Sequence, residues 1–187
     1  MDSFSEFAPA LAATLWLAAA AAVDQMRHRI PNPLAVSGAL LGLALQCWLQ
    51  GWAGLSDGLA GFAAGLLLFL PLYAFGWMGG GDVKLMAAAG VFAGWPGSLL
   101  AVSLSAGIGA SAALVLIGVR GGMVEYLNRW GHMARCLIGT GRVYYVPPPP
   151  GSAASQSFPY AFAIALGTLA ALWWLGRFDP WLRLLGV

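Results

Sequence analysis

Apolar runs separated by short polar stretches dominate the chain. They cover residues 6–23, 32–50, 56–76, 83–95, 98–119 and 158–175. A helix needs ~20 mostly apolar residues to cross the hydrocarbon of a bilayer. The fourth run is shorter than the others and follows three consecutive glycines. The pattern therefore predicts an all-α, polytopic membrane helical bundle of about six transmembrane segments, with a short, broken fourth segment.

Local turn signals mark the boundaries between these runs. Asn32 followed by Pro33 is typical of a helix start, with Asn as the N-cap and Pro in the first helical position. Residues 51–57 predict a tight polar turn, and Ser56 is the expected cap of the helix that follows. Residues 95–97, Trp-Pro-Gly, predict a second turn.

A longer polar stretch, residues 120–157, interrupts the apolar pattern. Apolar side chains recur there at helical spacing, with polar side chains mostly between them: Met123, Tyr126, Leu127, Trp130 and Leu137 against Glu125, Asn128, Arg129, His132 and Arg135. This pattern is typical of an interfacial amphipathic helix. The four prolines at 147–150 predict a stiff, extended spacer, and residues 177–187 predict a short interfacial tail.

Composition supports a membrane protein and excludes several other classes. The chain has 187 residues, of which 60% are hydrophobic and 9% charged, whereas soluble domains carry about 25% charged residues. One integral-membrane domain, residues 1–187, is expected at this length, with a cytoplasmic loop at about 120–157. No basic stripe interleaved with aromatics indicates nucleic-acid binding. Cys47 and Cys136 form no Cys-x-x-Cys pair, so we expect neither a metal site nor a cofactor.

The placement of Lys and Arg sets the expected orientation in the membrane. Basic residues follow the first, third and fifth runs: Arg27, Arg29, Lys84, Arg120, Arg129, Arg135 and Arg142. The connections at 51–57 and 95–97 contain none. The N-terminus is therefore expected outside and the basic loops in the cytoplasm, although Arg177 and Arg183 in the tail favour the opposite orientation. Because acidic residues precede the first run and basic ones follow it, we expect a retained helix rather than a cleaved signal.

Two aspartates at the ends of apolar segments are the candidate chemistry. Asp24 ends the first run, and Asp82 opens the fourth. Ionisable groups at the edge of hydrocarbon are costly, and the expected orientation places both at the cytoplasmic side. Taken singly, Asp24 is typical of an ordinary helix-end charge and Asp82 of a helix N-cap. Taken together, two carboxylates that share one proton can hold a water for peptide hydrolysis.

The residues around Asp82 favour such a site. Gly79, Gly80 and Gly81 lack Cβ atoms, so the backbone can unwind and a substrate strand can approach closely. Lys84 is close enough in sequence to stabilise an ionised Asp82, although it also serves as a marker of the cytoplasmic side.

The two stretches together resemble the type IV prepilin peptidase family, aspartic proteases of bacterial inner membranes. That family carries one aspartate upstream of Ile-Pro-Asn and a second in Gly-x-Gly-Asp-x-Lys. Asp24 with Ile30, Pro31 and Asn32 matches the first element, and residues 79–84 match the second. A weaker match is residues 158–165, which resemble the stretch that opens the family's last helix, with Phe162 in place of a proline. The resemblance implies that Asp24 and Asp82 are catalytic.

The resemblance also implies supporting residues, a substrate and a location. The supporting or substrate-site residues are Ile30, Pro31, Asn32, Gly79, Gly80, Gly81 and Lys84. The implied substrate is a prepilin or pseudopilin, with a short basic leader before an apolar helix, cut at the cytoplasmic face of the bacterial inner membrane. The bilayer and the pilus-assembly machinery are the other expected partners.

The sequence also departs from the larger family members. Those proteins have an N-terminal cytoplasmic portion with cysteine pairs and methylate the new N-terminus of the pilin. This sequence lacks the cysteine pairs. It resembles the short, peptidase-only branch of tight-adherence (Flp-type) pilus systems, so no methyltransferase activity is expected.

Two rival interpretations share some of these features. Intramembrane proteases of the presenilin type also have a Gly-x-Gly-Asp site, but they typically carry a Tyr-Asp pair within one helix and cut inside the bilayer. Here Val23 precedes Asp24. A small proton-coupled transporter or an assembly protein also uses membrane carboxylates, but needs neither Ile30-Pro31-Asn32 nor the triple glycine.

Overall fold

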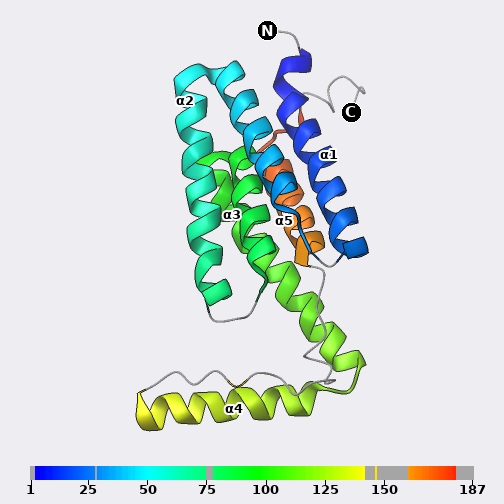
Figure 1. The fold of residues 1–187 in the computed structure, drawn as a ribbon, viewed down its shortest axis with the longest axis vertical. Coiled ribbons are helices and arrows are strands. Elements are labelled where there is room, and N and C mark those ends of the chain that lie inside the picture. Colours follow the sequence, from blue (N-terminus) through cyan, green and yellow to red (C-terminus); the bar gives the residue numbers. More distant parts are fainter. Residues whose placement is uncertain (1–2, 28, 75–77, 142–145, 147–159, 180–187) are drawn as a thin grey trace. The chain divides into compact units, whose positions relative to one another are not determined.

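Helices make up the part of the chain that the computed structural model describes, residues 3–27, 29–74, 78–141, 146 and 160–179. In chain order they are α1 (Ser3–Arg27), α2 (Asn32–Ala74), α3 (Gly80–Val119), α4 (Met123–Thr140) and α5 (Tyr160–Trp174) (Figure 1). The all-α prediction is therefore confirmed for these residues. The polyproline run, residues 158–159 and the tail beyond residue 179 lie outside the described residues.

The chain divides into two compact units. The first comprises Met1–Ile108 and Pro159–Val187, and the second Gly109–Phe158. The second unit holds the end of α3, all of α4 and the predicted loop at 120–157.

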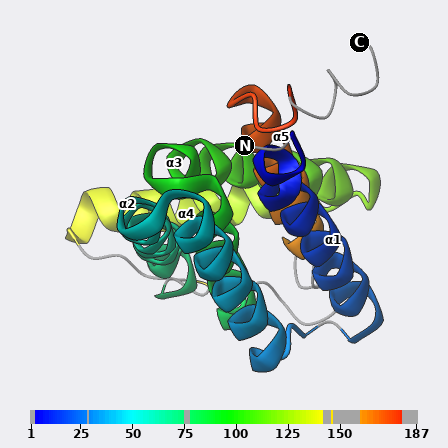
Figure 2. The same cartoon turned by 90° about the horizontal axis from the view of Figure 1, so that it is seen from above.

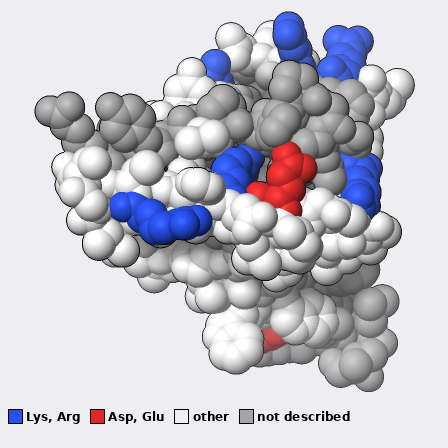
Figure 3. Space-filling view, turned by 90° about the horizontal axis from the view of Figure 1, so that it is seen from below, with Lys and Arg blue, Asp and Glu red and all other residues white. Residues whose placement is uncertain are grey.

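Three of the described helices are long and apolar enough to cross a membrane. They are Ala8–Arg27 within α1, Asn32–Ala74 and Gly80–Val119, and α5 is a shorter apolar helix. On the face drawn in Figure 3, several Lys and Arg side chains and an acidic side chain stand out against a mostly uncharged surface. The apolar helices indicate a membrane protein, but six separate spans are not shown.

Single glycines, rather than the predicted multi-residue turns, interrupt α2 and α3. Gly51 has φ 60° and ψ −140°, and Gly94 has φ 72° and ψ −178°. Glycine adopts positive φ without the penalty that a Cβ imposes, so each helix folds back on itself at one residue. Three predictions were therefore wrong. Residues 52–57 and 95–97 are helical rather than turns, and Ser56 lies inside α2, where its hydroxyl donates to the Ala53 carbonyl instead of capping a helix.

The first part of α3 forms the centre of the first unit. Nearly every residue from Val83 to Ala93 is buried, and Leu85 and Met86 are fully so. A helix that is apolar all round is typical of such a buried position. Because its surroundings are protein, this segment needs no full membrane-spanning length.

Glycines on the second half of α2 allow it to lie close against α3. Gly54, Gly58, Gly61 and Gly65 are all buried. A Cβ on Gly61 would collide with the Gly90 carbonyl, and a Cβ on Gly90 with the Gly61 carbonyl. Small residues at this spacing let membrane helices approach at backbone distance.

The outer helices of the first unit complete the packing. α1 lies against α2 and α5, as both views of the ribbon show (Figures 1 and 2). The Trp16 indole donates to the Leu34 carbonyl at 3.0 Å and packs near Phe92. On the other side, a Cβ on Gly167 of α5 would collide with Ser105 of α3. α1 and the start of α3 are thereby held in one bundle.

Candidate active site

The two candidate aspartates occupy opposite kinds of helix end. Asp24 lies in the last turn of α1 and is only 6% exposed. Asp82 lies in the first turn of α3 and is half-buried. A helix carries partial negative charge at its C-terminal end and partial positive charge at its N-terminal end. A carboxylate is therefore favoured at the position of Asp82 and disfavoured at that of Asp24.

Backbone contacts at the triple glycine define the position of Asp82. The Gly79 N–H donates to Asp82 Oδ2 at 3.2 Å, and the Asp82 N–H donates to the Gly79 carbonyl at 3.1 Å. Asp82 is the third residue of α3, so its side chain reaches back to the residue before the helix, as the acidic half of a capping box does. It is therefore not the N-cap residue itself, which is the position suggested by the sequence taken alone.

The structure brings the two sequence stretches together. The Asp24 and Asp82 carboxylates lie within electrostatic range of each other. Ile30 packs on the triple glycine, where a Cβ on Gly81 would lie 3.3 Å from the Ile30 Cβ. Gly81 therefore allows the start of α3 to approach the segment that joins α1 to α2.

A hydrogen bond between distant residues closes the same arrangement. Lys84 Nζ donates to Asn32 Oδ1 at 2.9 Å, across 52 positions of sequence. The expected partner of Lys84 was the Asp82 carboxylate, whereas its hydrogen bond in the structure goes to the first residue of α2. We call this pair the Asn32–Lys84 clamp.

The start of α2 explains why Asn32 is available for this bond. The Pro31 carbonyl accepts from the Leu34 N–H at 3.0 Å and from the Ala35 N–H at 3.4 Å. Pro31 therefore occupies the cap position and Asn32 the first helical position, so the helix begins one residue earlier than the sequence predicts. The side chain of Asn32 is not used for capping and points to Lys84 instead.

Tyr160 is a further polar residue at this site that the sequence did not single out. It is the first residue of α5, is half-buried, and lies within electrostatic range of Asp82. Its ring packs edge-on against Phe69 at 6.1 Å, and its hydroxyl lies 3.5 Å from the Ser105 carbonyl. The available signal was the weak match of residues 158–165.

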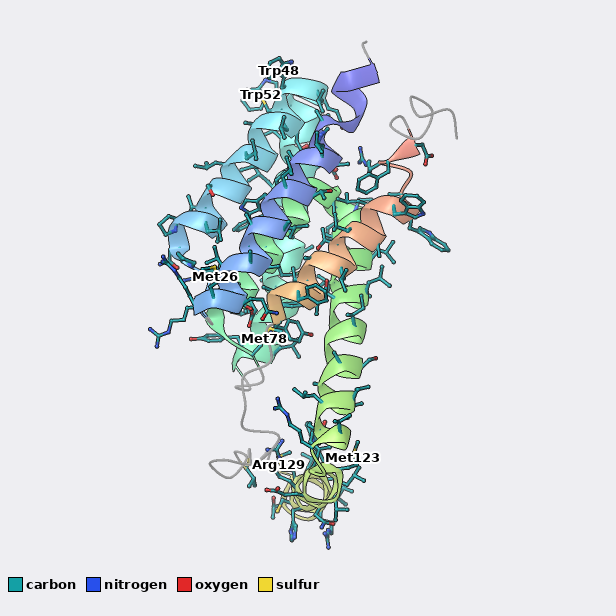
Figure 4. All side chains as sticks on the ribbon, turned by 90° about the vertical axis from the view of Figure 1, so that its right-hand side faces the viewer. Met26, Trp48, Trp52, Met78, Met123 and Arg129 are labelled. Atoms are coloured by element: carbon teal, nitrogen blue, oxygen red, sulfur yellow. The ribbon has the colours of Figure 1, made fainter. Side chains whose placement is uncertain are left out.

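The site lies at one end of the first unit. Met26, two residues after Asp24, and Met78, shortly before α3, are at this end (Figure 4). Trp48 and Trp52 lie at the opposite end in the same view. His28, in the joining segment, lies outside the described residues.

The arrangement suits chemistry that needs two carboxylates. Among the described residues, no three His, Cys, Asp or Glu side chains gather closely enough to hold a metal ion. Two carboxylates within range of each other, one buried and one half-buried, can instead hold a water molecule between them.

Comparisons with known proteins match the part of the chain that holds these residues. The chain is 30% identical over 114 residues to the prepilin leader peptidase/N-methyltransferase of Pseudomonas putida, a match that covers 56% of this chain and 38% of that protein. The chain thus spans well under two thirds of the length of this relative. No solved structure matches this chain. The model of the type IV leader peptidase family matches residues 11–114, a segment that contains Asp24, the Asn32–Lys84 clamp and Asp82. With more than half of its length matched, the chain belongs to the type IV leader peptidase family.

Proposed function

We propose that this protein is an aspartic endopeptidase that removes the leader peptide from type IV or Flp-type prepilins or pseudopilins. Asp24 and Asp82 are its catalytic residues. The observation that carries the proposal is the junction of the two sequence stretches, in which Asp24 and Asp82 come within electrostatic range while the Asn32–Lys84 clamp joins their flanks.

The chemistry follows from two carboxylates that share one proton. The ionised carboxylate takes a proton from a bound water as the water oxygen attacks the carbonyl carbon of the scissile peptide bond. The protonated carboxylate donates a hydrogen bond to the carbonyl oxygen. When the tetrahedral intermediate collapses, the C–N bond breaks and the leaving nitrogen takes a proton from the pair. Because the two groups are coupled, their titration belongs to the pair rather than to either residue.

The surrounding residues fit a substrate that arrives as an extended strand. Gly79 and Gly80 carry no side chain beside Asp82, so a substrate backbone can approach closely. Gly79 is also exposed. The site's place at one end of the first unit suits a cut at the membrane surface, between a leader in water and an apolar helix in lipid. Basic residues near the site favour the cytoplasmic side of a bacterial inner membrane.

Methyl transfer is not part of this proposal. The family relative in Pseudomonas putida is named for both activities, but the two carboxylates of the proposed site account for hydrolysis alone. We therefore expect a mature pilin with an unmethylated N-terminus. Mass spectrometry of the processed pilin would reveal a methyl group if one were added.

Co-expression with a candidate prepilin tests the catalytic pair. Asp24→Asn and Asp82→Asn should each lower the rate of processing by at least about a hundredfold, the scale of losing a general acid or base. Processing is followed by the size of the pilin on a gel. Glu125→Gln is the matched control, because Glu125 is an exposed carboxylate of α4, and should leave processing unchanged.

Two results would contradict the proposal. Continued processing by either aspartate variant, with the protein present in the membrane, would remove that residue from the mechanism. A cut within the apolar helix of the pilin, rather than at the end of its leader, would favour a presenilin-like protease instead.

A further inference from the structure

A short turn with its own backbone hydrogen bonds joins α3 to α4 in the second unit. Gly121 has φ 72°, the Gly121 N–H donates to the Gly118 carbonyl at 3.1 Å, and the Gly122 N–H donates to the Ile117 carbonyl at 2.9 Å. These two hydrogen bonds, together with the left-handed conformation of Gly121, form a Schellman motif. Only three residues, 120–122, therefore separate α4 from the end of a candidate membrane span.

The direction of α4 suits a position at the membrane surface. In Figures 1 and 4, α4 lies across the line of the final turns of α3. If these final turns of α3 stand along the membrane normal, a helix that leaves them in this direction lies in the plane of the headgroups. The 18 residues of α4 include none that are buried in the structure.

One stripe of apolar residues along α4 is exposed in the structure. Val124, Leu127, Ala134 and Ile138 share one stripe of the helix at spacings of three, seven and four residues. All four are exposed, Leu127 by 60% and Ile138 by 86%. We call these residues the exposed stripe.

The neighbouring apolar stripe of α4 makes contacts within the second unit. Met123 lies close to Gly118, and the Met133 sulfur accepts from the Val146 N–H at 3.5 Å. Tyr126 and Trp130, on the same side, pack together with ring centroids 6.1 Å apart. The exposed stripe is therefore a second apolar surface beside a partly covered one.

Charge decides what the exposed stripe fits. Three arginines, Arg120, Arg129 and Arg135, accompany one acidic residue, Glu125, between residues 120 and 141. Anionic lipid headgroups attract basic residues next to a membrane span, and long basic side chains can keep their stems on apolar surface while the charge stays at the phosphates.

We propose that α4 lies in the headgroup layer of an anionic membrane, with its exposed stripe in the acyl boundary and the exposed Arg120 and Arg135 at lipid phosphates. This surface is separate from the candidate active site and does not depend on peptidase activity.

Fluorescent labels on the full chain in vesicles test the proposal. Cys47 and Cys136, both exposed, are first replaced by serine. Single cysteines are then placed in the exposed stripe (Leu127→Cys, Ile138→Cys) and on the polar side (Asn128→Cys, His132→Cys). The protein is reconstituted in phosphatidylcholine vesicles with or without one-third phosphatidylglycerol. Quenching by iodide in water is compared with quenching by spin-labelled lipid.

In vesicles that contain phosphatidylglycerol, the two stripe labels should be quenched by lipid, with blue-shifted emission, and the polar-side labels by iodide. In phosphatidylcholine alone, lipid quenching of the stripe labels should weaken. Arg120→Gln with Arg135→Gln, which removes the two exposed arginines, should abolish the difference between the two lipid mixtures.

Other patterns would overturn the proposal. Equal iodide quenching on both sides would place α4 in water. Stripe labels shielded from both quenchers would mean that another protein surface covers them. Equal lipid quenching in both vesicle types, unaffected by the arginine variants, would remove the role of anionic headgroups.

Discussion

Asp24 lies at a helix C-terminus, where the partial negative charge of the helix disfavours a carboxylate. It is buried in the last turn of α1, where the helix end carries partial negative charge. Asp82 has the favourable helix end and the Gly79 N–H as a partner. The position of Asp82 therefore has a structural explanation of its own. In the proposed function, both carboxylates act on the same substrate, which requires them at one site.

The Asn32–Lys84 clamp has a testable consequence at the residue scale. Lys84→Ala and Asn32→Ala should each lower kcat/KM for pilin cleavage, by roughly the fivefold to tenfold expected of one hydrogen bond of about 1 kcal/mol. The double variant should be no worse than the more impaired single variant, because both lose the same contact. Cleavage rates of the purified proteins in detergent provide the measurement.

Arg29→Ala controls for the loss of a basic charge near the site, since Arg29 is exposed two residues before Pro31. Additive losses in the double variant would show that Asn32 and Lys84 act separately. Full activity of Lys84→Ala would leave Lys84 only as a marker of the cytoplasmic side.

Helix α2 and the start of α3 approach at a distance that only glycine permits. Gly61→Ala places a methyl group against the Gly90 carbonyl, and backbone atoms cannot move aside as a flexible side chain can. We expect a loss of stability of roughly 1–3 kcal/mol, as for other overpacked contacts. The measurement is the midpoint of thermal unfolding in detergent.

Gly107→Ala is the matched control within α3, because nothing lies within 4 Å of its added Cβ. It should leave stability unchanged or raise it slightly, since alanine favours a helix over glycine. Equal stability of the two variants would show that α2 and α3 do not pack as closely as the structure indicates.

The apolar periodicity was sufficient to predict helices, but not how they fold back. Trp95-Pro96-Gly97 predicts a turn, yet proline is also common in the first turn of a helix. In the structure the chain reverses at Gly94, and the proline lies in the helix that follows. Gly58 and Gly61 appear in the sequence as breakers, whereas their close packing depends on Val91 and Gly90 of another helix. Local signals predicted both motifs of the site. The Asn32–Lys84 bond depends on tertiary structure that no local pattern contains.

At the scale of the whole molecule, the first unit has two chemically different ends. Met26 and Met78 lie at the end that holds the candidate site, and Trp48 and Trp52 lie at the other (Figure 4). Both tryptophans are highly exposed. Tryptophan concentrates at membrane–water interfaces because its ring is apolar and its N–H is polar. Under the proposed function, the two ends correspond to two membrane faces, with Asp24 and Asp82 at one of them.

The proposed orientation can be tested with two residues of matched exposure. Met26 is 82% exposed and Trp52 is 85% exposed, at opposite ends of the unit. In a variant without Cys47 and Cys136, Met26→Cys should react with a membrane-impermeant maleimide only after cells are lysed. Trp52→Cys should react in intact spheroplasts. Labelling is followed by the mass of the protein on a gel, and lysed cells, in which both cysteines should react, control for reactivity. The opposite pattern would place Asp24 and Asp82 outside the cytoplasm, away from the basic leader that the proposed reaction requires, and the prepilin proposal would then fail even if the two carboxylates hydrolyse peptides.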